Sequence, residues 1–406
     1  MKLKQYSLIK YIGPGFISAV AGLEITNIGS FSYVASLYGF RILWAIVFAI
    51  AVTAFFQQLA VEVGVCRRRG IVAEARGSLG KTFTLFMMIT LYISNMLTAT
   101  LNIAGAGMAI EAYTGMPWYI IGLTFTTLVC GIIVKRNHKR VGRILTILSV
   151  TLAIYIVLAL EHIVEKPEIL LNILEGIFIP HFEVSRDFIL DFLMILGAAA
   201  APYSIIFNVS SVLNRSIYEL PEEIRDIILG LIFTSISGVS IAIASANPVL
   251  RVDTIYEIIL VLKSIKPIYA VLFIIGSTSS ALLSTLAIIL CNTYILYEYK
   301  GYNIIWEDVV YTKRYRSQVA LSILTIICIM LGLGLLYDMS VKVYMVMLKL
   351  ASISTSFASW IPCVIIVVAY WSIKEFKSIF IRVISVLLVC FLVVANIIGL
   401  ISVVYS

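Results

Sequence analysis

Long apolar runs follow one another along the whole chain, separated by short polar connections. Each run is long enough for a helix to cross a hydrocarbon core of roughly 30 Å. The runs are continuous and rich in Ile, Leu, Val and Ala, whereas the strands of a membrane barrel would alternate in polarity. The predicted fold class is therefore all-α and integral to the membrane, with about eleven spans at residues 13–37, 42–65, 83–112, 117–134, 144–163, 188–212, 226–249, 267–297, 318–337, 343–370 and 379–404.

The composition supports this prediction. Of the 406 residues, 61% are apolar and 13% are charged, which lies outside the range of soluble globular domains. No connection is long enough for a soluble domain, so we predict one transmembrane domain over 1–406, and the connection 164–187 is expected to carry a short interfacial helix. No motif combines a nucleophile, a base and an orienting group. We therefore expect neither an enzyme nor a cofactor.

The net charge of +8 is explained by topology. If the amino terminus is cytoplasmic, the segments on the inner side hold 22 of the 30 Lys and Arg residues and the outer segments hold 7, with Lys349 inside a span. This asymmetry is what the positive-inside rule expects. The predicted location is the cell membrane, with the amino end cytoplasmic, the carboxyl end extracellular and the lipid bilayer, but no nucleic acid, as a partner.

Two of the spans contain a disruption. Glu24 lies within AVAGLEITNIGSF of the first run, and an ionisable residue inside a span is a functional-site hypothesis by default. Pro202 lies within GAAAAPYSIIFN of the sixth run, where proline removes a backbone donor and predicts a helix break near 199–203. Paired breaks five helices apart are typical of inverted-repeat transporters. We assign residues 13–163 to a first repeat, 188–370 to a second and 379–404 to an additional helix.

Several segments resemble the Nramp family of divalent metal transporters. The matching segments are IGPGFISAVAGLEITN, YGFRILWAI, FFQQLAVEVGV and ILGAAAAPYSIIFNVSSVLNR, and the GMP of 115–117 closes the third helix as in the family. The resemblance covers nearly all of the chain. It implies a LeuT-type fold with five plus five repeated helices, one extra helix, and helices one and six broken at the middle of the membrane.

The resemblance also implies a metal site. The family binds metal through Asp and Asn of an Asp-Pro-Gly-Asn motif in helix one, and here Glu24 and Asn27 take these places. In helix six the family uses an Ala carbonyl and a Met sulfur, which correspond to the carbonyl of Ala198 and to Ala201. Because thioether sulfur selects softer metals, its loss favours a hard cation. This looks like the Nramp-related magnesium transporters, so a partly hydrated Mg²⁺ with Mn²⁺ tolerated is the expected substrate.

The proton pathway of the family is not retained at the matching positions. Acids of helix three correspond to Ala99 and Asn102, and the His of helix six corresponds to Tyr203, whose phenol does not titrate near neutrality. We therefore expect transport by alternating access that is not coupled to protons. A membrane potential supplies about 2.3 kcal/mol per charge per 100 mV, so a divalent cation can enter downhill.

Lys349 leaves two alternatives open. It can snorkel to the outer interface, or it can turn inward and pair with Glu24, which would suit a transporter of an anionic or other non-metal solute. For the function of the protein, the alternative to any transporter is a membrane sensor or scaffold that does not transport. Three further intramembrane amides, Asn95, Gln57 and Asn208, are expected to hydrogen-bond between helices. The sequence does not indicate an oligomeric state.

Overall fold

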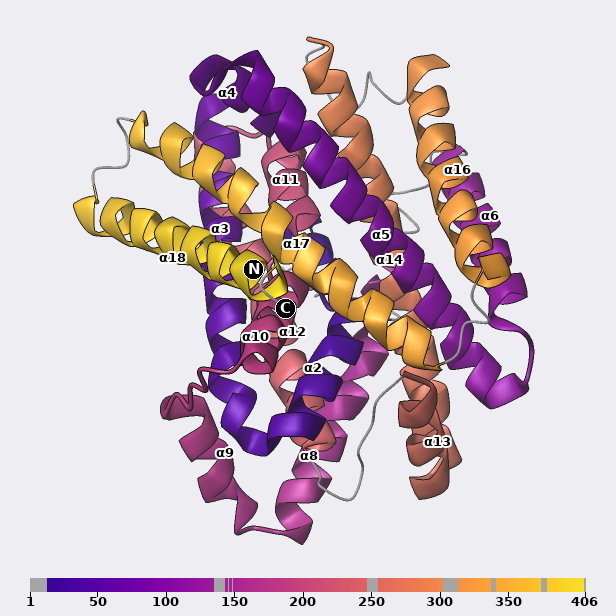
Figure 1. The fold of residues 1–406 in the computed structure, drawn as a ribbon. Coiled ribbons are helices and arrows are strands. Elements are labelled where there is room, and N and C mark those ends of the chain that lie inside the picture. Colours follow the sequence, from indigo (N-terminus) through magenta and orange to yellow (C-terminus); the bar gives the residue numbers. More distant parts are fainter. Residues whose placement is uncertain are drawn as a thin grey trace, which may run out of the picture.

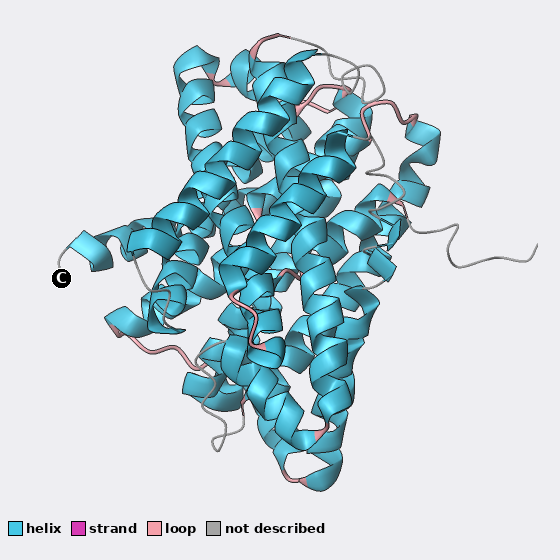
Figure 2. Cartoon of the chain, turned by 90° about the vertical axis from the view of Figure 1, so that its right-hand side faces the viewer, coloured by secondary structure: helices cyan, strands magenta, loops and turns pink. Residues whose placement is uncertain are grey.

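The computed structural model describes residues 13–134, 143–144, 146–147, 149–246, 255–301, 313–336, 341–373 and 378–404, and helices form the regular secondary structure of these residues (Figures 1 and 2). The α-helices are α1 (Pro14–Ala21), α2 (Ile25–Tyr38), α3 (Leu43–Arg67), α4 (Ile71–Ser78), α5 (Gly80–Thr114), α6 (Trp118–Val134), α8 (Ile154–Glu165), α9 (Ile169–Phe178), α10 (Arg186–Ala199), α11 (Pro202–Ser211), α12 (Leu220–Ser245), α13 (Ile255–Ile265), α14 (Pro267–Tyr299), α16 (Lys313–Leu336), α17 (Val341–Trp371) and α18 (Ile379–Val404). Short 3₁₀ turns are η2 (Gly39–Ile42), η3 (Val150–Ala153) and η4 (Ile217–Glu219).

The all-helical prediction is confirmed. Within the described residues, eight helical stretches are long and apolar enough to cross a membrane, and one of them, Ile25–Arg67, joins the first two predicted spans through η2. The fourth span corresponds to the shorter helix α6, and the fifth, 144–163, lies partly outside the described residues. The total of eleven therefore stays a prediction. The short helix expected in 164–187 is α9, whereas α4 and α13 were not anticipated.

The helices define two ends of the molecule. Figure 1 shows α4 at one end and α9 and α13 at the other, and we call these ends the α4 face and the α9 face. The long helices α5 and α14 pack against each other, and α10 packs against α17. The four short helices α1, α2, α10 and α11 lie among these longer ones and supply both helix breaks. The division into two repeats, 13–163 and 188–370, stays a prediction.

The first break separates α1 from α2 without a proline. Helix α1 ends at Ala21, and α2 begins at Ile25 after Glu24, whose backbone is extended (φ −76°, ψ 168°). Backbone carbonyls freed inside a membrane require other donors, and side chains provide them here. Tyr203 Oη donates to the Ala21 carbonyl at 3.0 Å, Asn27 Nδ2 donates to that of Gly22, and Ser280 Oγ donates to that of Leu23 at 2.6 Å.

The second break separates α10 from α11 and lies within the range predicted from Pro202. Ala200 and Ala201 leave the helical conformation (ψ 51° and 116°), and Pro202 opens α11. Because proline has no N–H, it cannot donate the helical hydrogen bond to the carbonyl of Ala198. A second carbonyl at this break, that of Ala201, accepts hydrogen bonds from the backbone N–H of Ser204 at 3.1 Å and from the Ser204 hydroxyl at 2.7 Å.

A carboxylate of α12 holds the start of α1. Asp226 accepts hydrogen bonds from the backbone N–H groups of Gly13 at 2.8 Å and Phe16 at 3.0 Å. These are unpaired donors at a helix N-terminus, where a negative charge is favourable. A Cβ on Gly13 would lie 2.6 Å from the Asp226 carboxylate. The glycine therefore lets Asp226 reach the end of the helix and hold α1 against α12.

Gly197 allows α10 and α17 to touch through their backbones. A Cβ at this position would lie 1.7 Å from the carbonyl oxygen of Ser352. We expect Gly197→Ala to force the two helices apart and to destabilise the protein by about 1–3 kcal/mol, the usual cost of overpacking. Thermal unfolding of purified protein in detergent measures this change. The matched control is Gly131→Ala in α6, where the added Cβ meets nothing within 4 Å; equal losses for both variants would contradict the prediction.

Candidate functional site

Glu24 lies at the first break, and its side chain is surrounded by donors. The residue is 2% exposed. Thr26 Oγ1 donates to Oε1 at 2.9 Å, while Asn102 Nδ2 at 2.6 Å and Ser284 Oγ donate to Oε2. Tyr203 Oη lies 3.1 Å from Oε2 and shares its single proton between this oxygen and the Ala21 carbonyl. The donors come from α2, α5, α11 and α14. The carboxylate is therefore a junction between both broken helices and the two long helices packed beside them.

The same groups bond to one another. Asn102 Nδ2 also donates to Ser284 Oγ at 2.9 Å, and the hydroxyls of Tyr203 and Ser284 lie 3.2 Å apart. Burying a charge away from water is costly unless hydrogen bonds satisfy it, and this network meets that requirement. Because the three hydroxyls and the Asn102 amide also carry oxygen atoms, they are able to face either a carboxylate or a hard cation.

A small cavity lies at the first break, where Gly22 and Leu23 line it. Its volume is about 20 Å³, which is enough for roughly one water molecule. Its polar wall contains Asn27 and Gln57, and Ala199 of α10 also lines it. The oxygens Asn27 Oδ1 and Gln57 Oε1 are buried and have no hydrogen-bond partner among the described residues, while Gln57 Nε2 donates to Ser204 Oγ at 2.9 Å. Two amide acceptors thus remain available among the residues that line this cavity, although Glu24 itself does not line it.

The predicted site residues separate into two groups. Glu24 and Asn27 lie within one turn of each other at the break, and Asn102 and Tyr203 contact Glu24 directly. The alanines 198, 199 and 201 surround the second break, but only Ala199 of these lines the cavity. Ala99, one turn before Asn102 on α5, is buried in the core.

The other intramembrane amides have mixed roles. Asn95 of α5 donates to Asn292 of α14 at 2.7 Å, and Gln57 joins α3 to α11 through Ser204, as expected for hydrogen bonds between helices. Asn208 of α11 is fully buried, and within the described residues its side chain has no partner. The interpretation of Asn208 as a hydrogen bonder between helices is therefore wrong for this conformation.

Lys349 does not pair with Glu24, and this alternative is wrong. Its Nζ lies 2.6 Å from Asp191 Oδ1 on α10, and Tyr38 Oη at the end of α2 donates to Asp191 Oδ2 at 2.9 Å. The Asp191 side chain is 2% exposed and that of Lys349 is 28% exposed. The ammonium is therefore held between helices by Asp191, and its depth relative to the membrane interface stays a prediction. A carboxylate within reach on α10 is the physical reason, since pairing inside a low-dielectric region favours both charges.

Sequence reasoning missed four of the residues at these sites. Asp191 is an ionisable residue inside the sixth predicted span, which is itself a signal of function. Ser280 and Ser284 belong to a small polar stripe on α14, in which Ser277, Ser280 and Ser284 recur at helical spacing. Such a stripe on an apolar helix indicates a polar interior face. Thr26 was not considered because the family resemblance drew attention only to Glu24 and Asn27 on either side of it.

Known proteins match this chain over much of its length. The divalent metal cation transporter MntH of Bacillus subtilis is 22% identical over 249 residues, which cover 59% of this chain and 58% of that protein. Metal transporter Nramp6 of Arabidopsis thaliana is 22% identical over 213 residues, which cover 52% of this chain and 40% of that protein. The matched segments thus span less than two thirds of these relatives.

Solved structures match the whole fold. A manganese transporter of Eremococcus coleocola superposes with a TM-score of 0.77 at 14% identity, covering 98% of this chain and 88% of that chain. The structure of MhsT in complex with L-phenylalanine superposes with a TM-score of 0.66 at 16% identity, covering 100% of this chain and 99% of that chain. The family described as natural resistance-associated macrophage protein-like matches residues 15–402. On this match over nearly its whole length, the chain belongs to the Nramp family.

Proposed function

We propose that the protein is a secondary transporter that moves a hard divalent cation, Mg²⁺ with Mn²⁺ tolerated, across the cell membrane by alternating access. The observation that carries the proposal is the buried carboxylate of Glu24 at the first helix break, joined to the second broken helix through Tyr203, together with the unpartnered oxygens of Asn27 and Gln57 at the cavity next to the first break. The relatives named as metal cation transporters support the class of substrate.

The choice of a hard cation rests on the atoms around the site. Glu24, Asn27, Gln57 and the hydroxyls beside them offer oxygen, and none of these side chains carries sulfur or imidazole. Carboxylate, carbonyl and water oxygens suit Mg²⁺ and Mn²⁺, whereas thioether and imidazole suit softer transition metals. We assign the protein ligands to Glu24, Asn27 and the Ala198 carbonyl, with water completing the coordination of the ion.

Transport without protons is the second part of the proposal. Asn102 and Tyr203 occupy the family's proton-carrier positions and instead act as hydrogen-bond donors to Glu24. A relay needs groups that exchange protons at the working pH, and an amide and a phenol do not. With the α9 face extracellular, as the distribution of Lys and Arg predicts, a membrane potential negative inside draws the cation inward.

An anionic substrate has less support. That alternative required Lys349 to face the site and to offset Glu24, but its ammonium contacts Asp191. A sensor or scaffold that does not transport has no structural feature in its favour and becomes an outcome of the flux experiment.

Ion flux into proteoliposomes tests the proposed function. With Mg²⁺, Mn²⁺ and Ca²⁺ compared and a pH-sensitive dye enclosed, we expect Mg²⁺ entry that depends on the membrane potential and leaves the internal pH unchanged. Acidification that follows the metal would contradict uncoupled transport. Protein that is correctly folded yet moves none of the three ions under any gradient would contradict the transport function itself.

A further inference from the structure

We propose that Tyr38, Asp191 and Lys349 form the gate that closes the ion route on the α9 face, and that Asp191 neutralises Lys349 so that a cation can pass it. The three residues come from α2, α10 and α17 and are joined by contacts of 2.9 and 2.6 Å. Glu24 and Asn27 are each 2% exposed, so the route to them is closed. The inference rests on the proposed function only in naming a divalent cation as the ion that passes the gate.

The position of the cluster along the helices supports a gate. Tyr38 is the last residue of α2 and lies eleven residues beyond Asn27, which corresponds to roughly 16 Å of helix. Between the cluster and the site, the hydroxyls of Ser30 on α2 and Ser352 on α17 lie 3.2 Å apart. The cluster is therefore an outer contact and the serine pair an inner contact on the same pair of helices. Opening the α9 face has to separate both.

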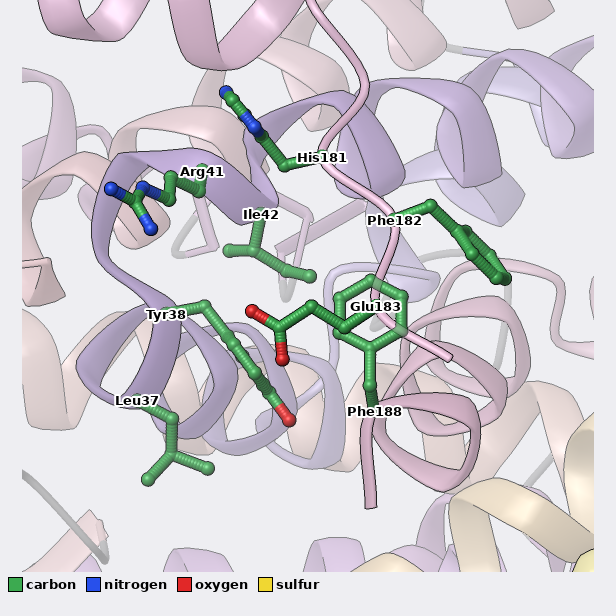
Figure 3. Close-up of a pocket in the computed structure, with 8 residues that line it drawn as sticks. All are labelled: Leu37, Tyr38, Arg41, Ile42, His181, Phe182, Glu183 and Phe188. Atoms are coloured by element: carbon green, nitrogen blue, oxygen red, sulfur yellow. The ribbon is translucent and has the colours of Figure 1, made fainter. Parts of the chain in front are cut away.

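A pocket outside the cluster marks where the route begins. It has a volume of about 300 Å³ and is lined by the end of α2, the turn η2 and the segment before α10. Figure 3 shows the Tyr38 ring as one wall, with the Glu183 carboxylate directed into the pocket and Arg41 and His181 at its rim. Tyr38 thus belongs both to the pocket and, through its hydroxyl, to the buried Asp191. Tyr38 is therefore the residue that the pocket and the cluster share.

Electrostatics gives Asp191 its role. An ammonium beside a cation route raises the energy of a passing divalent ion, and the effect is strong where water is excluded. The Asp191 carboxylate, held 2.6 Å from Lys349 Nζ, cancels that charge. Removing Asp191 alone leaves a lone positive charge, whereas removing both charges leaves none. The two variants are therefore expected to differ in ion flux although both break the ion pair.

Cysteine accessibility measures gate opening independently of transport. Ser352→Cys, placed in a variant whose six native cysteines are replaced by alanine, reports access to the space between the gate and the site. Two membrane-impermeant methanethiosulfonate reagents, one cationic and one anionic, are applied to the membrane face at which Val184→Cys reacts, since Val184 is 91% exposed next to α10. We expect Lys349→Met and Asp191→Asn each to speed the reaction with both reagents at least about fivefold.

Two controls accompany these variants: one exchanges the charges of residues 349 and 191, and the other breaks a different ion pair. The double variant Lys349→Asp with Asp191→Lys is expected to restore slow labelling, because the pair is rebuilt in the opposite sense. Lys266→Met, which breaks the exposed 3.5 Å pair with Glu161 on the same face, is expected to leave labelling unchanged. In flux assays, Asp191→Asn is expected to slow Mg²⁺ entry more than the double neutral variant Lys349→Met with Asp191→Asn.

The outcomes are distinguishable. Faster labelling by both reagents, reversed by charge exchange, supports the gate even if no metal flux is found, in which case only the proposed function fails. Labelling that stays slow in both single variants overturns the gate. Acceleration of the cationic reagent with slowing of the anionic one in Lys349→Met shows a change in local potential alone, and this also overturns it. Size-exclusion profiles of each variant exclude misfolded protein from the comparison.

Discussion

Replacing Glu24 with glutamine is expected to reduce Mg²⁺ flux at least about tenfold, the lower end of the effect seen for groups that support metal binding. The carboxylate is the charged member of the network formed with Thr26, Asn102, Tyr203 and Ser284. A glutamine removes the charge that balances a divalent ion and turns an amide N–H₂ toward groups that already donate. Initial rates in proteoliposomes at a fixed membrane potential measure the loss.

Two variants control this experiment. Glu62→Gln on α3 changes another buried carboxylate, which accepts from Gln58 at 2.9 Å, and it should keep most of the flux. Glu24→Asp retains the charge but is one methylene shorter, so we expect an intermediate rate as contacts to α5, α11 and α14 lengthen. Mg²⁺ entry that is unchanged in well-folded Glu24→Gln protein would remove Glu24 from the ion site.

Introducing methionine at position 201 is expected to shift selectivity from Mg²⁺ towards Mn²⁺ by about tenfold, because Mn²⁺, although it suits oxygen ligands, is a transition-metal ion and accepts a thioether more readily than Mg²⁺ does. Ala201 is the residue before Pro202 at the second break and is 1% exposed. A sulfur placed there would take the position of the family's methionine. Competition between Mg²⁺ and Mn²⁺ for entry gives the selectivity ratio directly.

Ala201→Leu is the matched control for this change. Leucine and methionine have similar volumes, so both variants crowd the break to a comparable extent and only methionine brings sulfur. An equal shift in both variants would show that packing, and not a ligand, sets selectivity at this position. No shift in the methionine variant, with transport retained, would argue against Ala201 as the position that decides between hard and soft ions.

The helix breaks show how far the sequence alone could lead. Proline 202 predicts the second break from backbone chemistry, because a residue without an N–H interrupts a helix wherever it stands. The first break has no such local cause. It depends on Tyr203 and Ser280, and contacts between distant residues are not encoded in any short stretch. The family resemblance supplied that break, and the structure supplies its physical explanation.

The charged residues show more clearly which contacts could not be predicted from the sequence. Lys349 is conspicuous in the sequence, but its partner could not be chosen from spacing, since Glu24 and Asp191 lie in different predicted spans and either could face it. Asp191 becomes the partner of Lys349 only through the packing of α10 against α17, which Gly197 makes close. The sequence could identify which residues carry charge inside the membrane. It could not determine which of them meet.

The first break also has a consequence for how the chain enters the membrane during synthesis. Its Ala21 and Leu23 carbonyls depend on hydroxyls that follow 182 and 257 residues later. When the first span leaves the ribosome, those hydroxyls have not been made, and an unpaired carbonyl in lipid is costly. The first span is therefore expected to insert as an uninterrupted helix and to open at Gly22–Glu24 only after α14 has joined it. The proposed ion site is in this sense expected to be completed late in biogenesis.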